Sequence, residues 1–221
     1  MILDRDSFIL THTRLQPVPH APELSLHLAD EVTPIWQLTE EALARIGLPP
    51  PFWAFAWAGG QALARYVLDN RSIVAGKSVL DFASGSGLVG IAAMKAGARD
   101  VLASEIDDFA LHAIALNGRA NGVCLDARKV DLIGDMTIAA DVILAGDVCY
   151  ERPMAEGVTE WLAALADQGK TVLVGDPGRY YLPRDRLEAL ASYEVPVVGD
   201  LEDREVKRTH VWRFRAITAP G

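Results

Sequence analysis

The chain has 221 residues, half of them hydrophobic, which is enough for one α/β domain with a sizeable core and excludes a disordered protein. Its 30 acidic residues outnumber the 21 Lys and Arg. The resulting net charge of −9 disfavours nucleic acid as the main partner, because proteins that bind a phosphate backbone usually carry a basic patch. A lysine-rich protein partner is compatible with this charge, as is plain solubility. No apolar run approaches the roughly 18–20 residues of a membrane helix, so we expect no membrane span.

The first residues, MILDRDSFILTHTRL, argue against a targeting sequence. Two aspartates interrupt the region that should be positive and then apolar in a signal peptide, and the segment lacks the acid-poor, Arg-rich composition of a transit peptide. The two cysteines, Cys124 and Cys149, form neither a metal-binding spacing nor a disulfide framework. We expect a cytoplasmic protein with no metal site.

The N-terminal 50 residues are predicted to form an arm and a helix. Residues 1–32 are interpreted as an irregular arm with room for a short helix. Residues 33–47 have a helix start at Thr33, with Pro34 in the first position, and a stop at Gly47. The prolines of LPPPFWAFAW then exclude a helix until a second one begins at residue 59 and runs to residue 70. We therefore divide the chain into an arm with its helix (1–50) and a main domain (51–221).

From Lys77 onward, short β-branched runs alternate with Ala-rich helical segments. The predicted strands cover residues 77–83, 100–106, 124–131, 140–147 and 170–177, and the predicted helices cover residues 87–97, 107–122, 153–168 and 183–192. Such alternation predicts a parallel sheet with helices on both faces. Two last strands, 193–200 and 205–216, are separated only by LEDR, which permits an antiparallel hairpin and is too short for a parallel crossover. The expected fold is α/β: a doubly wound, mostly parallel seven-stranded sheet with a C-terminal antiparallel hairpin and an N-terminal helical extension.

The stretch VLDFASGSGLVG (79–90) fits the G-x-G-x-x-G spacing of dinucleotide-binding loops, yet Asp81 stands just ahead of its glycines. A pyrophosphate on the following helix N-terminus would not favour a carboxylate there. S-adenosylmethionine has no phosphate, carries a sulfonium, and ends in an amino acid whose ammonium a carboxylate can bind. At ~4 Å and an effective dielectric constant of about 20, such a pair contributes a few kcal/mol before desolvation. Asp81 therefore favours S-adenosylmethionine over a nicotinamide cofactor.

Glu105 ends the second predicted strand of the sheet, twenty positions after Gly85. Both kinds of cofactor place an acid here to bind ribose hydroxyls, so Glu105 indicates an adenosine-type ligand without choosing between them. A glycine-rich turn alone can also be a connection between a strand and a helix with no ligand. The combination of Asp81, Glu105 and the terminal hairpin favours a cofactor site.

On these motifs the chain resembles the class I (seven-strand) S-adenosylmethionine-dependent methyltransferases. LDFASGSG resembles their first motif, although Ala83 stands in the first glycine place, where we expect a tighter turn rather than a lost site. ASEID resembles the acidic tip of their second strand. The resemblance implies a cofactor site made of two groups of residues. One surrounds the first motif (Asp81, Ala83, Ser84, Gly85 and Gly87), and the other comes from three further segments (Trp57, Gly60, Glu105, Ile106 and Asp131, the last at the adenine).

Two further segments narrow the resemblance to protein-lysine methyltransferases. PFWAFAWAGGQALARYVLDN (51–70) and GDVCYE (146–151) are similar to the branch whose fourth strand ends in D-x-x-Y/F, and closest to the electron-transfer-flavoprotein β-subunit lysine methyltransferases. The likeness covers roughly residues 45–215. It implies that the substrate partner is the β subunit of electron transfer flavoprotein, with a ribosomal protein as the alternative. Separately from the resemblance, we expect a monomer.

The same resemblance implies how the residues act. Asp147 would bind the incoming lysine amine, with Tyr150 shaping the channel beside it; a helix N-cap is the alternative role of Asp147. Trp57 and the Gly59-Gly60 turn would cover the cofactor, and Phe55 with Trp57 would face its sulfonium. A hydrophobic staple formed by Trp53 and Trp57 is the alternative.

Three features have simpler interpretations, and three other functions remain open. His112 and His210 are interpreted as structural, and Arg179-Tyr180-Tyr181 as a loop on the substrate side. A nicotinamide oxidoreductase would leave Asp81 and the D-x-x-Y motif unexplained. A non-catalytic binding protein would not need Asp147 and Tyr150. An amino-methylating nucleic-acid enzyme would carry an N/D-P-P-Y signature, which DVCY lacks.

Overall fold

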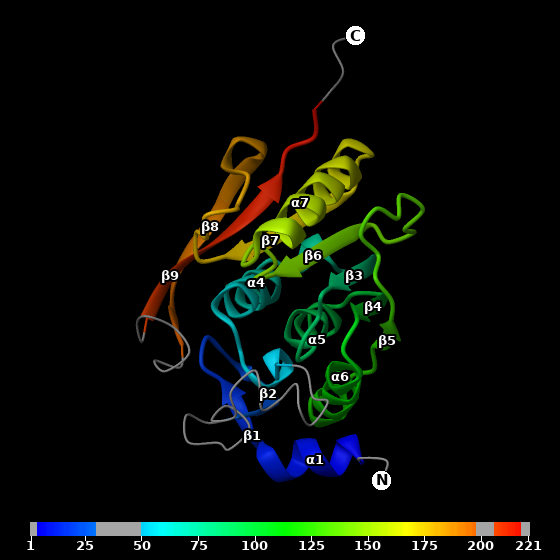
Figure 1. Cartoon of the computed structure of the whole chain (residues 1–221), viewed down its shortest axis with the longest axis vertical. Coiled ribbons are helices and arrows are strands. Elements are labelled where there is room, and N and C mark those ends of the chain that lie inside the picture. Colours follow the sequence, from blue (N-terminus) through cyan, green and yellow to red (C-terminus); the bar gives the residue numbers. More distant parts are fainter. Residues whose placement is uncertain (1–3, 30–49, 198–205, 218–221) are drawn as a thin grey trace.

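The computed structural model describes residues 4–29, 50–197 and 206–217, so the predicted helix over 33–47 and the LEDR link lie outside the described residues. Its centre is a seven-stranded sheet (Figure 1). In spatial order the strands are β5 (Asp126–Lys129), β4 (Asp100–Glu105), β3 (Ser78–Phe82), β6 (Val142–Gly146), β7 (Thr171–Asp176), β9 (Val206–Phe214) and β8 (Leu187–Pro196). The first five are parallel, whereas β9 is antiparallel to both β7 and β8. The predicted mostly parallel sheet with an antiparallel C-terminal hairpin is confirmed.

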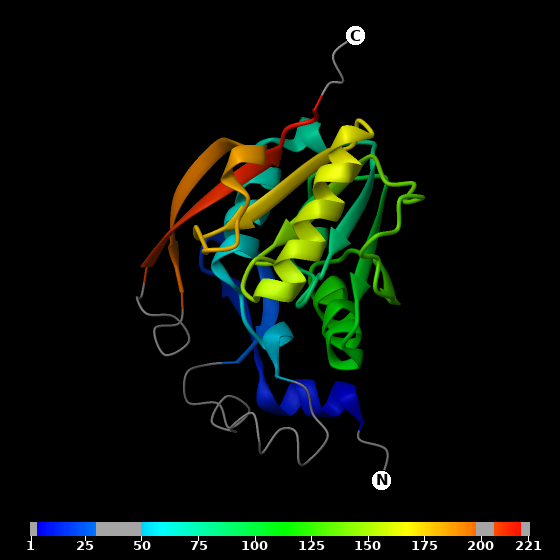
Figure 2. The same ribbon diagram turned by 45° about the horizontal axis from the view of Figure 1, so that its top comes forward.

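Helices cover both faces of this sheet. The main domain contains α4 (Ala58–Asp69), α5 (Leu88–Lys95), α6 (Asp108–Ala120) and α7 (Arg152–Asp167), with short 3-10 turns η1 (Phe52–Ala54) and η2 (Arg71–Ile73). Successive strand residues point to opposite faces, and the central strands are apolar on both. Leu80 and Ile143 pack with α7, whereas their neighbours Val79 and Leu144 pack with α4 and α5. Figure 2 shows α7 crossing the front of the sheet and α4 on its other side.

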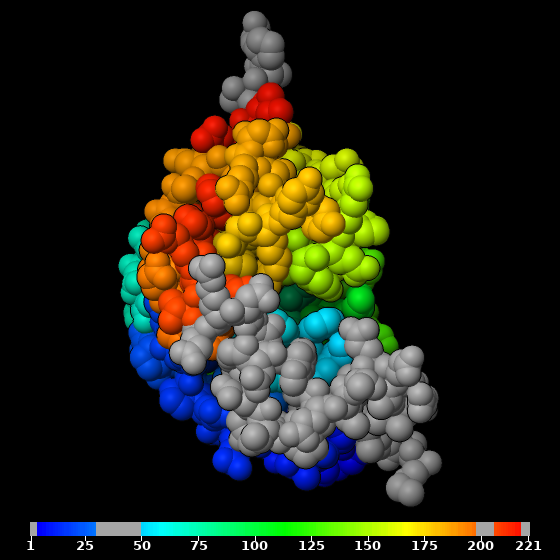
Figure 3. Space-filling model, turned by 60° about the vertical axis from the view of Figure 1, so that its left-hand side comes forward, coloured from blue at the N-terminus to red at the C-terminus, as the bar shows by residue number. Residues whose placement is uncertain are grey.

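The predicted helix over residues 183–192 is wrong. The chain there makes a 3-10 turn, η3 (Arg184–Arg186), and then enters the ten-residue strand β8. This strand pairs with β9 from Leu187 opposite Phe214 to Pro196 opposite Val206. LEALAS favours a helix in isolation, but pairing along β9 outweighs that propensity. The orange and red residues of β8 and β9 lie together on one face of the molecule (Figure 3).

The N-terminal extension is only partly helical. The expected short helix is α1 (Arg5–His12), but the rest of the described arm is an antiparallel hairpin of β1 (Arg14–Val18) and β2 (Ala21–Leu28) rather than irregular chain. Leu24 and Leu26 of β2 are fully buried in a cluster with side chains of α4 and α5. The hairpin is therefore an integral layer of the fold rather than a loose arm.

Two asparagines of α6 and its C-terminus fasten this hairpin to the main domain. The Asn117 side chain accepts a hydrogen bond from the His27 N–H (2.7 Å) and donates one to the Ser86 carbonyl in the glycine-rich turn (2.8 Å). Asn121 accepts from the Ser25 N–H (3.0 Å) and donates to the Ser25 carbonyl (2.6 Å). None of the helices in the described part of the chain is both long enough and apolar enough to span a membrane.

Candidate functional site

The glycine-rich turn joins β3 to α5 at the carboxyl ends of the parallel strands, where open α/β sheets bind their ligands. Ala83, in the first glycine place, has a φ of 50°, in the left-handed region that alanine adopts only with strain. Gly87, the N-cap of α5, has a φ of 84°. The Gly85 N–H donates to Glu105 Oε1 (2.8 Å), which ties the turn to the end of the neighbouring strand.

Asp81 lies beneath this turn and is only 1% exposed. Its Oδ2 accepts hydrogen bonds from the Gly90 N–H (2.8 Å) and the Ser84 hydroxyl (2.5 Å). Gly90 is the third residue of α5, whose first N–H groups have no partner within the helix, so Asp81 caps α5 from the strand side. A Cβ on Gly90 would lie 2.9 Å from this Oδ2 and 2.5 Å from Leu125 Cδ2, which explains the third glycine of the motif.

The buried carboxyl of Asp81 titrates near neutral pH. Burial raises its pKa to about 7, and the negative charge of Glu105 adds to this effect, while the hydrogen bonds from Ser84 and Gly90 act in the opposite direction. At neutral pH a positive group nearby would therefore favour the ionised form of Asp81.

The acidic residues predicted at the ends of β4 and β5 are both more accessible. Glu105 is partly buried, and its Oε2 accepts from the Ile106 N–H (2.8 Å). Ile106 itself is 68% exposed. Asp131 is exposed two residues after β5, and its carboxylate accepts from the Ile133 N–H (3.0 Å).

The first turn of α4 packs backbone to backbone on the ends of β6 and β7. A Cβ on Gly59 would lie 2.2 Å from the Gly175 carbonyl oxygen, and a Cβ on Gly146 would lie 2.9 Å from Gly60 Cα. Glycines at these positions let the helix approach the sheet this closely. The approach brings the Gly60 N–H to 2.7 Å from Asp147 Oδ2, so two predicted site residues meet directly.

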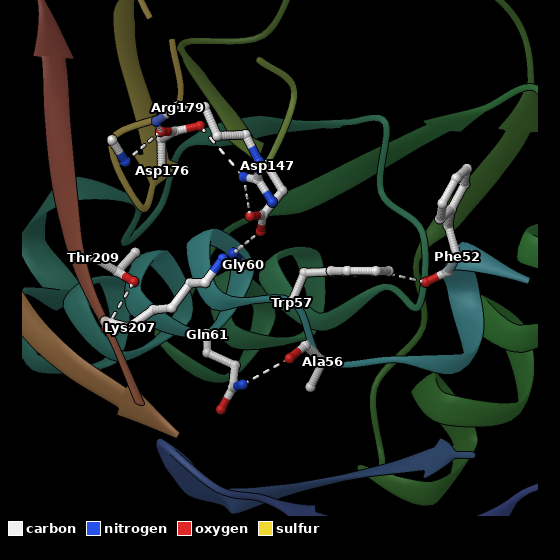
Figure 4. Close-up of polar contacts among 11 residues, drawn as sticks. Phe52, Ala56, Trp57, Gly60, Gln61, Asp147, Asp176, Arg179, Lys207 and Thr209 are labelled. Atoms are coloured by element: carbon white, nitrogen blue, oxygen red, sulfur yellow. Dashed lines mark hydrogen bonds and ion pairs between the residues drawn. The ribbon is translucent and has the colours of Figure 1, made fainter. Parts of the chain in front are cut away.

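Asp147, directly after β6, is the centre of the polar network in Figure 4. Its φ of 60° is left-handed, a conformation that aspartate tolerates better than most residues, and its N–H donates to the Gly175 carbonyl (2.9 Å). Besides accepting from Gly60, its carboxylate pairs through Oδ1 with Arg179 Nη1 at 2.6 Å, and the side chain is 12% exposed. The N-cap of α7 is Glu151, so the interpretation of Asp147 as that cap is wrong.

A second buried carboxylate directs Arg179 toward Asp147. Asp176, the last residue of β7, is fully buried, and its Oδ1 accepts from the N–H groups of Gly178 (2.6 Å) and Arg179 (2.7 Å). Its Oδ2 lies 3.5 Å from Arg179 Nη1. Burial raises the pKa of Asp176, and the positive charge of Arg179 lowers it.

The Cys149 thiol is close to these groups but does not act as a nucleophile. Burial raises its pKa to about 12, so it stays protonated at neutral pH.

A row of aromatic side chains extends from η1 to the segment after β6. The Phe52 ring lies 6.0 Å from the Trp57 ring and 5.9 Å from the Tyr150 ring, and Trp57 Nε1 donates to the Phe52 carbonyl (2.9 Å). Phe52 and Tyr150 are each almost half exposed. Trp53 instead is buried and stacks on Phe109 of α6, so it does not staple α4. Figure 4 shows Trp57 and Phe52 on the same side of the start of α4.

The remaining sequence expectations have mixed outcomes. His112 contacts Asp6 at 2.6 Å and links α6 to α1, as expected of a structural residue. Phe55 is buried in the cluster that contains Trp53. The sequence did not point to Asp176, to the Asp147–Arg179 pair or to Phe52 as parts of this region. Within residues 4–29, 50–197 and 206–217, no group of three or more His, Cys, Asp or Glu side chains is arranged to hold a metal ion.

Comparisons with known proteins agree with this geometry. The family model "Ribosomal protein L11 methyltransferase (PrmA)" matches residues 61–175. The chain is 35% identical over 218 residues to the electron transfer flavoprotein beta subunit lysine methyltransferase of Danio rerio, a match that covers 96% of this chain and 83% of the relative. It is 38% identical over 220 residues to the protein of that description from Homo sapiens, which covers 88% and 83%.

Solved structures share the fold at low sequence identity. Magnesium protoporphyrin IX methyltransferase (ChlM) from Synechocystis PCC 6803, solved with bound SAM, superimposes with a TM-score of 0.52 at 18% identity and covers 71% of this chain and 78% of that one. The Rossmann-like methyltransferase architecture that the sequence predicts is thus confirmed.

Proposed function

Because the chain belongs to the electron transfer flavoprotein beta subunit lysine methyltransferase family, and is thus a methyltransferase, we propose that it transfers methyl groups from S-adenosylmethionine to lysine ε-amines of the electron transfer flavoprotein β subunit. The observation that carries the proposal is the backbone conformation of Asp147 together with its hydrogen bond to α4. This residue follows the fourth parallel strand in a left-handed conformation and is bonded to the first turn of α4. Strain of this kind persists where the surrounding structure requires it, and it is most frequent at functional sites.

The residues around the glycine-rich turn fit S-adenosylmethionine. Two carboxyl groups, Asp81 and Glu105, are at the carboxyl ends of adjacent parallel strands, beside the N-terminus of α5. Asp81 would attract the ammonium of the cofactor, and Glu105 would accept from its ribose hydroxyls. A diphosphate would instead meet the negative charge of Asp81. When bound, the cofactor supplies the reactive methyl group and the leaving group.

Eight further residues would complete the cofactor site, each at the position that the family motifs assign to it. Helix and turn N–H groups in the glycine-rich segment would face the carboxylate of the cofactor. The exposed Ile106 would cover the adenine from one side. The residues are Ala83, Ser84, Gly85, Gly87, Ile106, Asp131, Trp57 and Gly60.

The substrate lysine must reach Asp147 as a neutral amine. Near pH 7 a lysine with a pKa of about 10.4 loses its proton at a cost of about 4.6 kcal/mol, taking ~1.36 kcal/mol per pKa unit. The partly exposed rings of Phe52 and Tyr150 would enclose the aliphatic part of the side chain and reduce its hydration. The amine lone pair would then face the methyl group of the bound cofactor; transfer would form the nitrogen–carbon bond and break the carbon–sulfur bond, whose electron pair would stay on sulfur.

The rival functions fit this site less well. A nicotinamide oxidoreductase would place a diphosphate beside Asp81 and would leave the conformation of Asp147 without a use. A ribosomal protein is the alternative substrate, because the PrmA family model is described by such an activity. The relatives that match most of the chain are electron transfer flavoprotein beta subunit lysine methyltransferases, which favours the flavoprotein subunit. We also propose a cytoplasmic monomer, for which size-exclusion chromatography with light scattering is the direct test of assembly.

The substrate can be identified without assuming it. A lysate is incubated with radiolabelled S-adenosylmethionine and the purified enzyme, and the labelled band is analysed by mass spectrometry. We expect methyl-lysine in the flavoprotein β subunit, and labelling of ribosomal protein alone would overturn the substrate assignment.

The role of Asp147 is tested by Asp147→Asn, which keeps the shape of the side chain. The variant should bind S-adenosylmethionine with wild-type affinity in calorimetry and lose at least about 100-fold in kcat/KM, since about two to three kcal/mol of orientation and charge are removed. Turnover within a factor of about three of the wild type would refute the proposed role.

A further inference from the structure

The carboxylate of Asp147 presents a problem for the proposed chemistry, and the arginine paired with it, Arg179, suggests how the problem is solved. A carboxylate alone beside an amine stabilises the ammonium form and raises the pKa of the amine. The reaction requires the opposite, a neutral amine with a free lone pair. An acceptor that orients the amine is useful only when its negative charge is balanced.

Arg179 supplies that balance in the structure. Its Nη1 is 2.6 Å from Asp147 Oδ1, and the pair is largely shielded from water, with side-chain exposures of 21% for Arg179 and 12% for Asp147. A guanidinium stays positively charged at every relevant pH. In such a shielded place the two charges are screened far less than they would be on the surface.

The position of Arg179 is fixed from behind. Asp176 accepts from the Arg179 backbone N–H and lies 3.5 Å from its Nη1, so the arginine bridges two carboxylates that end adjacent strands (Figure 4). Asp176 is fully buried, and both of its carboxylate oxygens already have partners in the turn after β7. Its hydrogen bonds to the turn after β7 hold that turn in the shape that directs the guanidinium to Asp147.

We infer that Arg179 is a positioning residue that acts through Asp147: it cancels the charge of this carboxylate, so that the site orients the target lysine without holding it as an ammonium ion. This inference rests on the proposed function. After its proton has passed to solvent, the neutral amine donates an N–H to Asp147 and keeps its lone pair directed away from the carboxylate.

Other titratable groups surround the pair. Asp176 and the buried Cys149 lie within electrostatic reach of both members, and the Tyr150 hydroxyl is close enough to feel the charges of Arg179, Glu151 and Glu105. His210 is directly opposite Asp176 in the β7–β9 register, and Lys207 extends from β9 toward the start of α4 in Figure 4. The thiol and the phenol have pKa values raised by burial, so they are neutral at pH 7 and leave the balance to the acids, Arg179 and Lys207.

The test is the pH profile of kcat for Arg179→Gln, measured at saturating concentration of the protein substrate that the wild-type enzyme methylates, because kcat reports the pKa values of the bound complex. We expect the acidic limb to move up by about one pH unit, because the unbalanced carboxylate holds the ammonium form. The loss should be about ten-fold near pH 7 and should shrink as the pH rises and the bound amine loses its proton in both enzymes. Arg179→Lys should restore most of the wild-type profile.

Controls separate this effect from a structural one. Arg184→Gln removes an arginine that bonds the Gly178 carbonyl (3.3 Å) in the same turn, and it should keep the wild-type limb. Cofactor affinity and thermal stability of Arg179→Gln are measured alongside. An equal loss at every pH, or no shift of the limb, would overturn the inference while the proposed function stands. Failure of the wild-type enzyme to methylate any lysine would instead overturn the proposed function and this inference together.

Discussion

Replacing Asp81 by asparagine should stabilise the free protein and weaken cofactor binding. Burial raises the pKa of this carboxyl from 3.8 to about 7, so above pH 7 the folded protein holds an ionised group that the unfolded chain solvates better. The shift of about three units corresponds to a destabilisation of about 4 kcal/mol above pH 7. The asparagine amide would keep an oxygen for the Gly90 N–H and the Ser84 hydroxyl without the charge. We therefore expect Asp81→Asn to gain about 1–3 kcal/mol in unfolding free energy at about pH 8.

The stability difference between the wild type and Asp81→Asn should depend on pH in one direction. Because the folded pKa is raised, the destabilisation is complete above pH 7, declines as the pH falls toward 4, and vanishes once the unfolded chain is also protonated. Urea denaturation of wild type and Asp81→Asn at about pH 4, 6 and 8 should show the two stabilities converging at low pH. Calorimetry at about pH 8 should show at least about ten-fold weaker S-adenosylmethionine binding by the variant, because the charge that attracts the ammonium is gone. A pH-independent stability difference, or unchanged affinity, would refute the reasoning.

Two further substitutions test the backbone of the site. Gly59→Ala would place a Cβ 2.2 Å from the Gly175 oxygen, so we expect the unfolding free energy measured by chemical denaturation to fall by at least about 3 kcal/mol. In the control Gly157→Ala the nearest neighbour of the new Cβ is at 3.7 Å, so the unfolding free energy should rise by up to about 1 kcal/mol from helix propensity. Equal effects of the two substitutions would contradict the close packing of α4. Ala83→Gly should relieve the strain of a φ of 50° and raise the unfolding free energy by about 0.5–1 kcal/mol, and a destabilised variant would show that Ala83 is not strained.

The parallel part of the fold was predictable because its central strands are short apolar runs between helical segments. Val79 and Leu80 face opposite layers, and a continuous apolar run is what a strand buried on both faces requires. The error at residues 183–192 has the opposite cause. There the local preference for a helix conflicts with a partner strand about twenty residues later, and no local pattern reveals that partner. In the N-terminal hairpin the alternation of Leu24, Leu26 and Leu28 is a signal for β2 that the prediction of an irregular arm did not take into account.

Single residues of the candidate site could be proposed from the sequence, whereas the contacts between distant segments could not. Asp147 and Gly60 were named from separate motifs, and the structure joins them by a hydrogen bond. Arg179 lies 32 positions after Asp147, and its approach depends on how the turn after β7 folds over Asp176. The Asp-Pro-Gly sequence there predicts a turn, but not the direction in which the following side chain points.

Mass spectrometry of purified electron transfer flavoprotein, after incubation with the enzyme and S-adenosylmethionine, tests the central claim most directly. We predict added methyl groups on lysine side chains of the β subunit with the wild-type enzyme and none with Asp147→Asn. A β subunit that stays unmodified while ribosomal protein or no protein at all is methylated under the same conditions would contradict it.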